Sequence, residues 1–392
     1  MKILQLHNYY QYRGGEDAYF DSLTELLSAN GHEVTKFTKN SKDILNSFKG
    51  QFSSALGMFW NTSVEQELET LIRLKKPDIA HFHNINPLIT NTAYFVCKKY
   101  NIPIVQTIHN YRFLCPKGTL FRNGNICQLC VTKRFKYPSI LYNCYHNSFP
   151  ASAVYASTFF LNTLSNSFNL IDIFIFSSLF SKSYFSSYTN FPDKKKTVIP
   201  YFVPDFRVKK INLAYKDYFL FVGRLSEEKG IIQLLEILKN IPLNLIVIGD
   251  GPLKDQVSSY GKFPNIRILN YCSRPEVLHY MSNAFCSIIP SRWFETGPLV
   301  MLESLCMGTP VIVPNIGSFK EIITSDDFGY RYNHKDFLSL KNKIELMWRN
   351  RKIWSQRKKE IKKYFYEKYS EKSHYDNLMD AYHKVLSVKN SK

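Results

Sequence analysis

The 392-residue sequence predicts an α/β protein built from two doubly wound parallel-sheet domains. Short apolar strand patterns alternate with loops and helix patterns along both halves of the chain, which is typical of βαβ units. The length also exceeds what one typical hydrophobic core supports, so two domains are expected. Ligands of such sheets bind beyond the carboxyl ends of the strands, and we therefore expect the functional loops there.

The first domain is expected to begin with the strand KILQLH, a loop and a helix whose apolar residues recur at helical spacing up to Gly31. His7, His83 and His109 stand at the ends of predicted strands, where each could face a ligand or simply close a strand. The further predicted strands of this domain are EVTKF (33–37), PDIAHFH (77–83), IPIVQTIH (102–109) and DIFIFSS (172–178).

A proline-bearing polar connector, 198–216, separates the second domain, in which the alternation starts again. The predicted helix IIQLLEILKNI follows the first strand and its loop. The predicted strand regions are DYFLFVGRLSEEKG (217–230), LNLIVIGDGP (243–252), NIRILN (265–270), CSIIP (286–290) and TPVIVP (309–314). The expected domain boundaries are 1–205 and 206–365, followed by a C-terminal helix in 366–392 that packs back on the first domain.

The chain is strongly basic, with 51 Lys and Arg against 32 Asp and Glu and a formal charge of +19. This balance indicates an anionic partner, either nucleic acid, a phosphorylated small molecule or an anionic bilayer, although a Lys-rich codon bias would give the same charge. No nucleic-acid-binding module is recognised, so nucleic acid is not expected. Neither a signal peptide nor a spanning segment stands out, so we expect a cytoplasmic protein with reduced cysteines.

The segment SRWFETGPLVMLESLCMGTPVIVP (291–314) holds two glutamates, Glu295 and Glu303, in a mostly apolar context. Strand patterns on both sides require a crossover helix between them. Gly297 as the cap and Pro298 as the first helical residue predict this helix from Pro298 to Met307. Glu295 then precedes the helix, and Glu303 lies inside it.

This arrangement places one carboxylate, the free N–H groups of a helix N-terminus and a second carboxylate in order along the chain. The sugar, diphosphate and ribose of a nucleotide-sugar need these three kinds of group in that order. A loop charge at Glu295 and a solvated helix residue at Glu303 are the alternative. The predicted donor-binding residues of this segment are Gly297, Pro298, Leu299 and Glu303.

Two other loops carry groups suited to a diphosphate. Arg224 and Lys229 follow a strand in GRLSEEKG, where two fixed cations can clamp a diphosphate and stabilise it as a leaving group. Gly14 and Gly15 lie in the first loop, where glycine lets the backbone approach a phosphate closely. Surface charge and a plain turn are the respective alternatives.

E-x7-E followed by GTPVI, together with GRLSEEKG and an amino-terminal GGE, resembles the retaining glycosyltransferases of family 4, which have the GT-B fold. The motifs occur in the family's order and cover nearly the whole chain. The resemblance implies two Rossmann-like domains that face a central cleft, an acceptor-side domain and a nucleotide-sugar-binding domain. It also implies a hexosyltransferase-type enzyme (EC 2.4) of surface-polysaccharide biosynthesis (O-antigen, capsule or exopolysaccharide) that needs no catalytic metal. The acceptor would be a saccharide or a polyprenyl-diphosphate-linked sugar. A nucleotide-sugar epimerase of the same fold and a non-catalytic sugar- or lipid-binding relative are the alternatives.

The resemblance also implies roles for single residues. Glu295 resembles the glutamate that contacts the donor sugar near its reacting carbon, and Glu303 the one that accepts hydrogen bonds from the ribose. His109 resembles a histidine near the donor sugar and acceptor, with a core histidine as the alternative. Gly249, in GDGP, resembles part of a donor-side loop, although such a tetrapeptide often only links a strand to a helix. The implied catalytic residues are His109, Arg224, Lys229 and Glu295.

Four of the eight cysteines fall in an expected insertion of the first domain at about 111–150, namely Cys115, Cys127, Cys130 and Cys144. Their C-x2-C pair and close spacing suit a closed structural Zn²⁺ site in a reducing compartment. Unmetallated buried thiols and redox chemistry are the alternatives.

Basic tracts lie beside aromatic residues at several places in the sequence. Such tracts suit peripheral contact with the anionic inner face of the cytoplasmic membrane, with solvated surface as the alternative. The tracts and the aromatic stretch considered with them are DKKKT (193–197), RVKK (207–210), RKKEIKKYFYEKY (357–369) and YASTFFLNTLSNSF (155–168).

Overall fold

The computed structural model describes every residue except 12–13, 45–57, 206–216, 270–271 and 391–392. The chain forms two compact units, each of which carries one six-stranded, wholly parallel sheet. The predicted α/β fold with two doubly wound parallel sheets is therefore confirmed. Unit 1 comprises Met1–Leu120, Cys127–Pro200 and His374–Lys392, and unit 2 comprises Phe121–Ile126 and Tyr201–Ser373.

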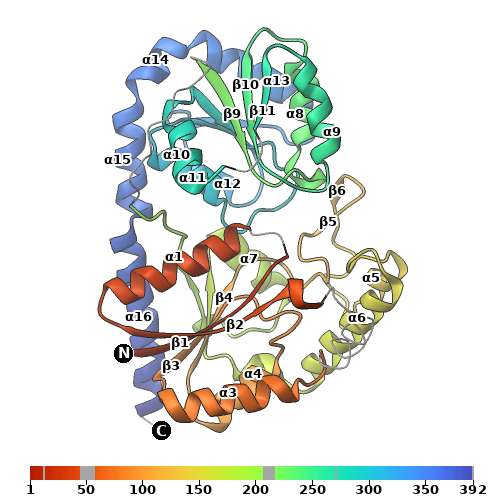
Figure 1. Cartoon of the computed structure of the whole chain (residues 1–392), viewed down its shortest axis with the longest axis vertical. Coiled ribbons are helices and arrows are strands. Elements are labelled where there is room, and N and C mark those ends of the chain that lie inside the picture. Colours follow the sequence, from red (N-terminus) through yellow and green to blue (C-terminus); the bar gives the residue numbers. More distant parts are fainter. Residues whose placement is uncertain (12–13, 45–57, 206–216, 270–271, 391–392) are drawn as a thin grey trace. The chain divides into compact units, whose positions relative to one another are not determined.

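The sheet of unit 1 has the strand order β2-β1-β3-β4-β7-β8. Its strands β1 to β4 are labelled in Figure 1. Its strands are β1 (Lys2–Tyr9), β2 (Glu33–Asn40), β3 (Ile79–Phe82), β4 (Ile104–Ile108), β7 (Ile173–Phe176) and β8 (Lys196–Val198). The helices of this unit are α1 (Gly15–Ala29), α3 (Thr62–Lys75), α4 (Thr92–Lys99), α5 (Tyr137–Leu141), α6 (Phe149–Leu164), α7 (Leu179–Tyr188) and nearly all of α16 (Glu371–Asn390).

Local sequence explains why these elements form where they do. Every residue of β3, β4 and β7 is buried, as expected for strands covered on both faces. The apolar face predicted for the first helix is buried in α1. Helices α3, α6 and α7 begin at capping residues Asn61, Ser148 and Ser178, whose side chains each accept a backbone N–H of the first turn.

The sheet of unit 2 has the order β11-β10-β9-β12-β13-β14. Its strands β9 to β11 are labelled in Figure 1. Its strands are β9 (Tyr218–Val222), β10 (Asn244–Ile248), β11 (Ile266–Leu269), β12 (Cys286–Ile288), β13 (Val311–Pro314) and β14 (Gly329–Tyr332). Its helices are α8 (Ile231–Leu238), α9 (Lys254–Ser258), α10 (Arg274–Asn283), α11 (Leu299–Cys306), α12 (Phe319–Ile322), α13 (Phe337–Arg349), α14 (Arg351–Gln356) and α15 (Lys358–Tyr369). An antiparallel hairpin, β5 (Phe121–Arg122) and β6 (Asn125–Ile126), also belongs to this unit.

Each strand order contains one topological switch point, where neighbouring parallel strands send their connections to opposite sides. In unit 1 this point lies between β1 and β3, and in unit 2 it lies between β9 and β12. Crevices at switch points are where open α/β sheets bind their ligands. A ligand site is therefore expected in the loops that follow these four strands.

The crossover helix predicted at 298–307 is present as α11, but it begins one residue later, with Pro298 at its N-cap. The C-terminal helix α16 joins unit 1 through buried polar contacts. The His81 Nδ1 lies 2.6 Å from the Tyr382 hydroxyl, and the Tyr19 hydroxyl lies 3.1 Å from the His374 Nε2. The connector predicted at 198–216 lies partly, and the basic tract 207–210 wholly, outside the described residues. Within the described part of the chain, no helix has the length and apolar character needed to cross a membrane.

Candidate functional site

Two glycines bring the loops of unit 2 together at the carboxyl end of its sheet. A Cβ at Gly249 would lie 1.9 Å from the carbonyl oxygen of Gly223, so only glycine lets the loops after β9 and β10 meet. Gly230 has a φ of +70°, and a Cβ there would lie 2.1 Å from the carbonyl oxygen of Pro290, just after β12. The contact found at Gly249, a predicted donor-binding residue, is thus with protein backbone.

Glu295 lies in the loop after β12, and one of its carboxylate oxygens accepts three hydrogen bonds. The Oε1 atom is 2.5 Å from the Lys229 Nζ, 2.9 Å from the Ser291 hydroxyl and 2.9 Å from the Trp293 Nε1. The backbone carbonyl of Glu295 accepts a further hydrogen bond, from the Ser318 hydroxyl. The carboxylate is therefore fixed in place, and its Oε2 has no partner among the described residues.

The two predicted cations differ in their surroundings. Lys229 is half-buried, pairs with Glu295 and lies 5.3 Å from the centroid of the Trp293 ring. This ion pair joins the loops after β9 and β12, which is the switch point of unit 2. Arg224, from the same loop as Lys229, is exposed to solvent. The structure thus brings Lys229 and Glu295 together and leaves Arg224 at the surface of the loop.

Glu303 is buried in the second turn of α11, as the sequence predicts. Its Oε1 pairs with the Arg274 guanidinium of α10 at 2.8 Å. Burial raises the pKa of Glu303, and the positive charge of Arg274 opposes this rise. Gly297 and Leu299 are half-buried and Pro298 is buried around the start of α11, where the first N–H groups of a helix lack intrahelical partners.

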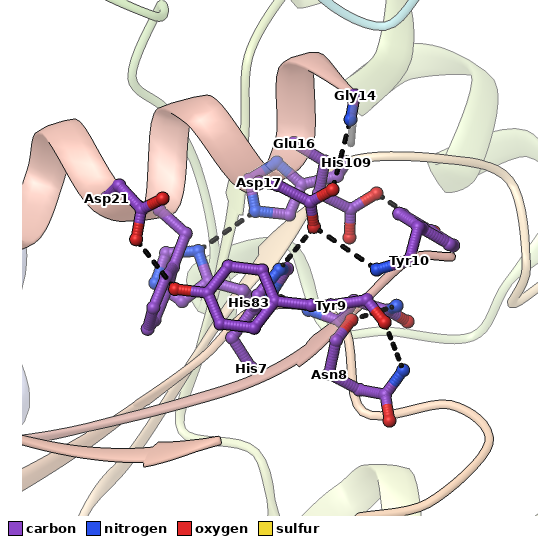
Figure 2. Close-up of polar contacts among 12 residues, drawn as sticks. His7, Asn8, Tyr9, Tyr10, Gly14, Glu16, Asp17, Asp21, His83 and His109 are labelled. Atoms are coloured by element: carbon purple, nitrogen blue, oxygen red, sulfur yellow. Dashed lines mark hydrogen bonds and ion pairs between the residues drawn. The ribbon is translucent and has the colours of Figure 1, made fainter. Parts of the chain in front are cut away.

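In unit 1, the loop that carries Gly14 and Gly15 is held by a buried carboxylate (Figure 2). Gly14 is the N-cap of α1, and its N–H donates to Oδ2 of Asp17 at 3.0 Å. The other oxygen of Asp17 lies 2.8 Å from the His7 Nε2. The His7 Nδ1 accepts the Asn84 N–H at 3.4 Å, so Nε2 carries the proton and donates to Asp17.

His109 directly follows β4, and its Nε2 lies 2.9 Å from the Nδ1 of His83 (Figure 2). Burial lowers the pKa of both side chains well below the usual range of histidine, so both are neutral near pH 7. A neutral imidazole can donate one hydrogen bond and accept another, but it supplies no fixed positive charge. The predicted site residue His109 is therefore paired with His83, which is not among the predicted site residues.

His83 and His109 line a pocket that lies wholly within unit 1. Four buried polar atoms of its lining have no hydrogen-bond partner among the described residues: Glu16 Oε1, His83 Nε2, Arg112 Nε and Thr158 Oγ1. A buried polar atom without a hydrogen-bond partner raises the free energy of the fold, so such a set indicates groups that bind a ligand or water. The aromatic rings of Phe113, Tyr155, Phe159 and Phe168 also line the pocket, together with several Asn side chains.

The family comparisons agree with this geometry. Residues 205–386 match the family model described as glycosyl transferases group 1, and residues 13–205 match that of glycosyltransferase family 4. The chain is a family 4-type glycosyltransferase. The resemblance seen in the motifs and the GT-B assignment are thereby confirmed.

Individual relatives are distant. The glycosyltransferase is 29% identical over 155 residues to an uncharacterised glycosyltransferase of Methanocaldococcus jannaschii, a match over 38% of this chain and 44% of that protein. It is 22% identical over 343 residues to an uncharacterised 42.6 kDa protein in the cps region of Klebsiella pneumoniae, covering 80% and 85% of the two chains. The solved structure of Anabaena Alr3699/HepE in complex with UDP-glucose superposes with a TM-score of 0.64 at 16% identity over the whole of both chains.

The four clustered cysteines of the glycosyltransferase lie in unit 1 as thiols and form no disulfide. Burial, and the nearby thiols of Cys115 and Cys144, raise the pKa of Cys130 to about 12. Among the residues that the structure describes, no three His, Cys, Asp or Glu side chains lie close enough together to hold a metal ion. The arrangement as it stands does not fit the predicted zinc site, and zinc stays a prediction from the sequence.

Several site residues were not found from the sequence. Trp293 and Ser291 lie in the same loop as Glu295, but nothing in their spacing marks them as its donors. Arg274 comes from another helix, and no sequence pattern marks it as the partner of Glu303. Asp17 did have one, because an acidic residue at the third position of a helix often binds the capping backbone N–H.

We predict that Asp17→Asn destabilises the glycosyltransferase by about 2 kcal/mol. Asp17 accepts the Gly14 N–H on Oδ2, and the His7 Nε2–H and a more distant Tyr10 N–H (3.5 Å) on Oδ1. An amide has only one acceptor oxygen, so at least one buried donor loses its partner. Urea unfolding measures the difference. Asp21→Asn is the matched control, because Asp21 accepts the Tyr9 hydroxyl from a half-buried position, whereas Asp17 is fully buried, and its cost should stay below about 1 kcal/mol (Figure 2). Equal losses in the two variants would contradict the role given to Asp17.

We also predict that stability falls as the pH drops below 6.5. Burial lowers the pKa of His374 from 6.5 to about 4, so the unfolded chain binds more protons than the folded chain between these values. His374→Gln should remove this contribution and reduce the pH slope of the unfolding free energy by about 1.4 kcal/mol per pH unit. Urea unfolding between pH 7.5 and 4.5 measures the slope. The exposed His383, substituted in the same way, should leave it unchanged, and an unchanged slope in His374→Gln would refute the assignment.

Proposed function

We propose that the glycosyltransferase transfers a hexosyl group, with retention of configuration, from a nucleotide-sugar to a saccharide or lipid-linked acceptor in surface-polysaccharide biosynthesis. The observation that carries the proposal is the Lys229–Glu295 pair at the switch point of unit 2. It sets a cation and a fixed carboxylate beside the start of α11, within one loop system. These are the groups that a diphosphate and the sugar attached to it require.

In this proposal the diphosphate is bound by Lys229, by Arg224 and by the first backbone N–H groups of α11. Their positive potential stabilises the negative charge that develops on the leaving group, so no catalytic metal is required. The ammonium of Lys229 has three N–H donors, and it can keep its contact with Glu295 while it donates to a phosphate oxygen. The exposed Arg224 is free to follow the phosphates.

The two glutamates then hold the remaining parts of the donor. The Oε1 of Glu295 is fully used by its three donors, which leaves Oε2 to accept a sugar hydroxyl near the reacting carbon. Glu303 accepts the ribose hydroxyls, either after the Arg274 guanidinium has moved away from its carboxylate or while it remains paired with one carboxylate oxygen. Gly249 keeps the loop after β10 close to the loop after β9.

The acceptor sugar occupies the pocket of unit 1 in this proposal. Its unpartnered atoms on Glu16, Arg112 and Thr158 mix donors with acceptors, as a polyhydroxylated ring requires. His109 and His83 lie in the same lining and orient the attacking hydroxyl. The UDP-glucose bound to Anabaena HepE supports a nucleotide-sugar donor, and the cps region of the Klebsiella relative supports a polysaccharide product. We place the enzyme at the inner face of the cytoplasmic membrane, where a lipid-linked acceptor would be found.

The proposal predicts nucleotide release from one member of a panel of nucleotide-sugars when a saccharide or lipid-linked acceptor extract is added. Proton NMR of the product should give the same anomeric configuration as the donor. An inverted product would overturn the retaining mechanism. Intact donors across the whole panel and all acceptors would overturn the proposed activity and favour a sugar-binding relative.

Glu295→Gln should lower kcat by about 30- to 1000-fold, equivalent to about 2–4 kcal/mol of transition-state stabilisation. The substitution keeps the size of the side chain but removes the charge that holds Lys229 and faces the sugar. Initial rates of nucleotide release measure the effect, with Glu345→Gln on the surface of α13 as the control. If kcat is unchanged while the thermal midpoint of the variant stays within a few degrees, Glu295 has no part in the reaction.

A further inference from the structure

Helix α6 of unit 1 is apolar on the side that faces solvent. It contains no charged residue over its 16 positions, Phe149–Leu164. Phe149 is 58% exposed, Leu161 48% and Leu164 46%. The opposite side of the helix contributes Tyr155, Thr158, Phe159 and Asn162 to the pocket of unit 1. The helix therefore has a ligand-facing side and an uncovered apolar side.

The chain just before α6 extends this exposed apolar area. Helix α5 packs against α6, and its last residue, Leu141, is 67% exposed. Phe135 contacts Phe160 of α6 edge to face, at 5.7 Å between ring centroids. The exposed apolar side chains of this region, called here the α5–α6 surface, are Phe135, Tyr137, Leu141, Tyr142, Phe149, Leu161 and Leu164.

The stretch of sequence that contains the α5–α6 surface carries only positive charge. From Ile79 to Ile171 the sequence holds no Asp or Glu. The basic residues over the same range are Lys98, Lys99, Arg112, Lys117, Arg122, Lys133, Arg134 and Lys136. Lys133 and Arg134 are exposed at the α5–α6 surface, and the Arg134 guanidinium lies 5.9 Å from the centroid of the Phe160 ring. Neither makes an ion pair with a carboxylate of the described residues.

We propose that the α5–α6 surface seats unit 1 on an anionic bilayer. Apolar side chains beside unpaired Lys and Arg are what binding at the headgroup boundary requires, with the apolar groups in the acyl region and the cations at anionic headgroups. At 1.5 Å per residue α6 is about 24 Å long, shorter than the hydrocarbon core of about 30 Å. Its inner side also lines the pocket. The helix therefore lies in the interface and does not cross it.

This surface is a better candidate than the basic tract predicted at 357–369. Helix α15 interleaves Glu360 and Glu367 with its lysines, and Lys363 is within 4.0 Å of Glu367. Its buried side chains, Ile361, Tyr364, Phe365 and Tyr369, belong to the interior of the fold. It thus offers charge of both signs, whereas the α5–α6 surface offers one sign and several apolar groups.

The inference rests on the proposed function, because membrane binding by unit 1 brings the enzyme to its acceptor only if that acceptor is lipid-linked. Helix α6 connects the two, since one side lies at the bilayer and the other lines the proposed acceptor pocket. An acceptor sugar just above the headgroups would then reach Thr158 and Phe159 without leaving its lipid anchor.

Vesicle binding by the full chain tests this surface directly. Sucrose-loaded vesicles of equal parts phosphatidylglycerol and phosphatidylcholine are sedimented with the protein, and phosphatidylcholine vesicles serve as the neutral comparison. Leu161→Glu with Leu164→Glu should lower the partition coefficient at least tenfold. The matched control is Leu74→Glu with Leu338→Glu, which makes the same charge change at side chains that are 74% and 62% exposed elsewhere. It should stay within twofold of the wild type.

A second pair of variants tests the charge without touching the apolar residues. Lys133→Gln with Arg134→Gln should weaken binding to the anionic vesicles by about fivefold per charge and reduce its dependence on salt. The control removes two exposed lysines of α15, with Lys359→Gln and Lys363→Gln, and should stay within twofold. This pair also keeps the test decisive if the Leu→Glu variant unfolds.

Three results would overturn the inference. The first is no binding of the wild type to anionic vesicles, and the second is equal losses in the surface variants and their controls. The third is a dimer that Leu161→Glu with Leu164→Glu dissociates in the absence of vesicles, which would assign the surface to a second copy of the chain. Turnover of a water-soluble acceptor analogue should be unchanged in all four variants. Vesicle binding therefore tests the α5–α6 surface, and turnover of the soluble acceptor analogue tests the proposed function. A failure of one measurement leaves the other claim standing.

Discussion

A single carboxylate oxygen, the Oε1 of Glu295, holds together the loop system at the switch point of unit 2. Burying a carboxylate is costly unless it is paired and hydrogen-bonded, and here Lys229, Ser291 and Trp293 all donate to it. Unit 1 solves the same problem with Asp17, which accepts from Gly14 and His7 next to β1 and β3. In both sheets a buried carboxylate thus orders a loop at the switch point, where a parallel sheet leaves room for a ligand.

The sequence could predict the positions of these loops because their signals are local. Apolar runs ended by glycine, proline or histidine place the strand ends, and an acidic residue one turn into a helix such as Glu303 can be read from the spacing alone. The predicted helix after Glu295 was wrong by one residue at each end, because Pro298 and Met307 cap α11 instead of belonging to it. The family resemblance then supplied roles that no spacing could give.

The partners of these residues could not be predicted, because they depend on tertiary packing. Arg274 reaches Glu303 from a different helix, and no pattern relates the two positions. The histidines at strand ends show the same limit, since His83 pairs with His109, while His81 contacts Tyr382 of the C-terminal helix. Their sequence context is similar, yet one histidine lines a pocket and the other joins a distant helix to the sheet.

Helix α6 shows how the same apolar composition can have two opposite meanings. A helix without charges reads as a buried core helix or as a membrane-associated one, and only the burial of each side chain separates the two. The aromatic stretch 155–168 was noted in the sequence, but its inner residues, such as Tyr155 and Phe159, line a pocket, and the exposed apolar groups lie on the other side. The lysine-rich tract of α15 was predicted to contact the membrane because it contains many charged residues. A bilayer, however, responds to charge of one sign beside uncovered apolar area, and that combination occurs at α5 and α6.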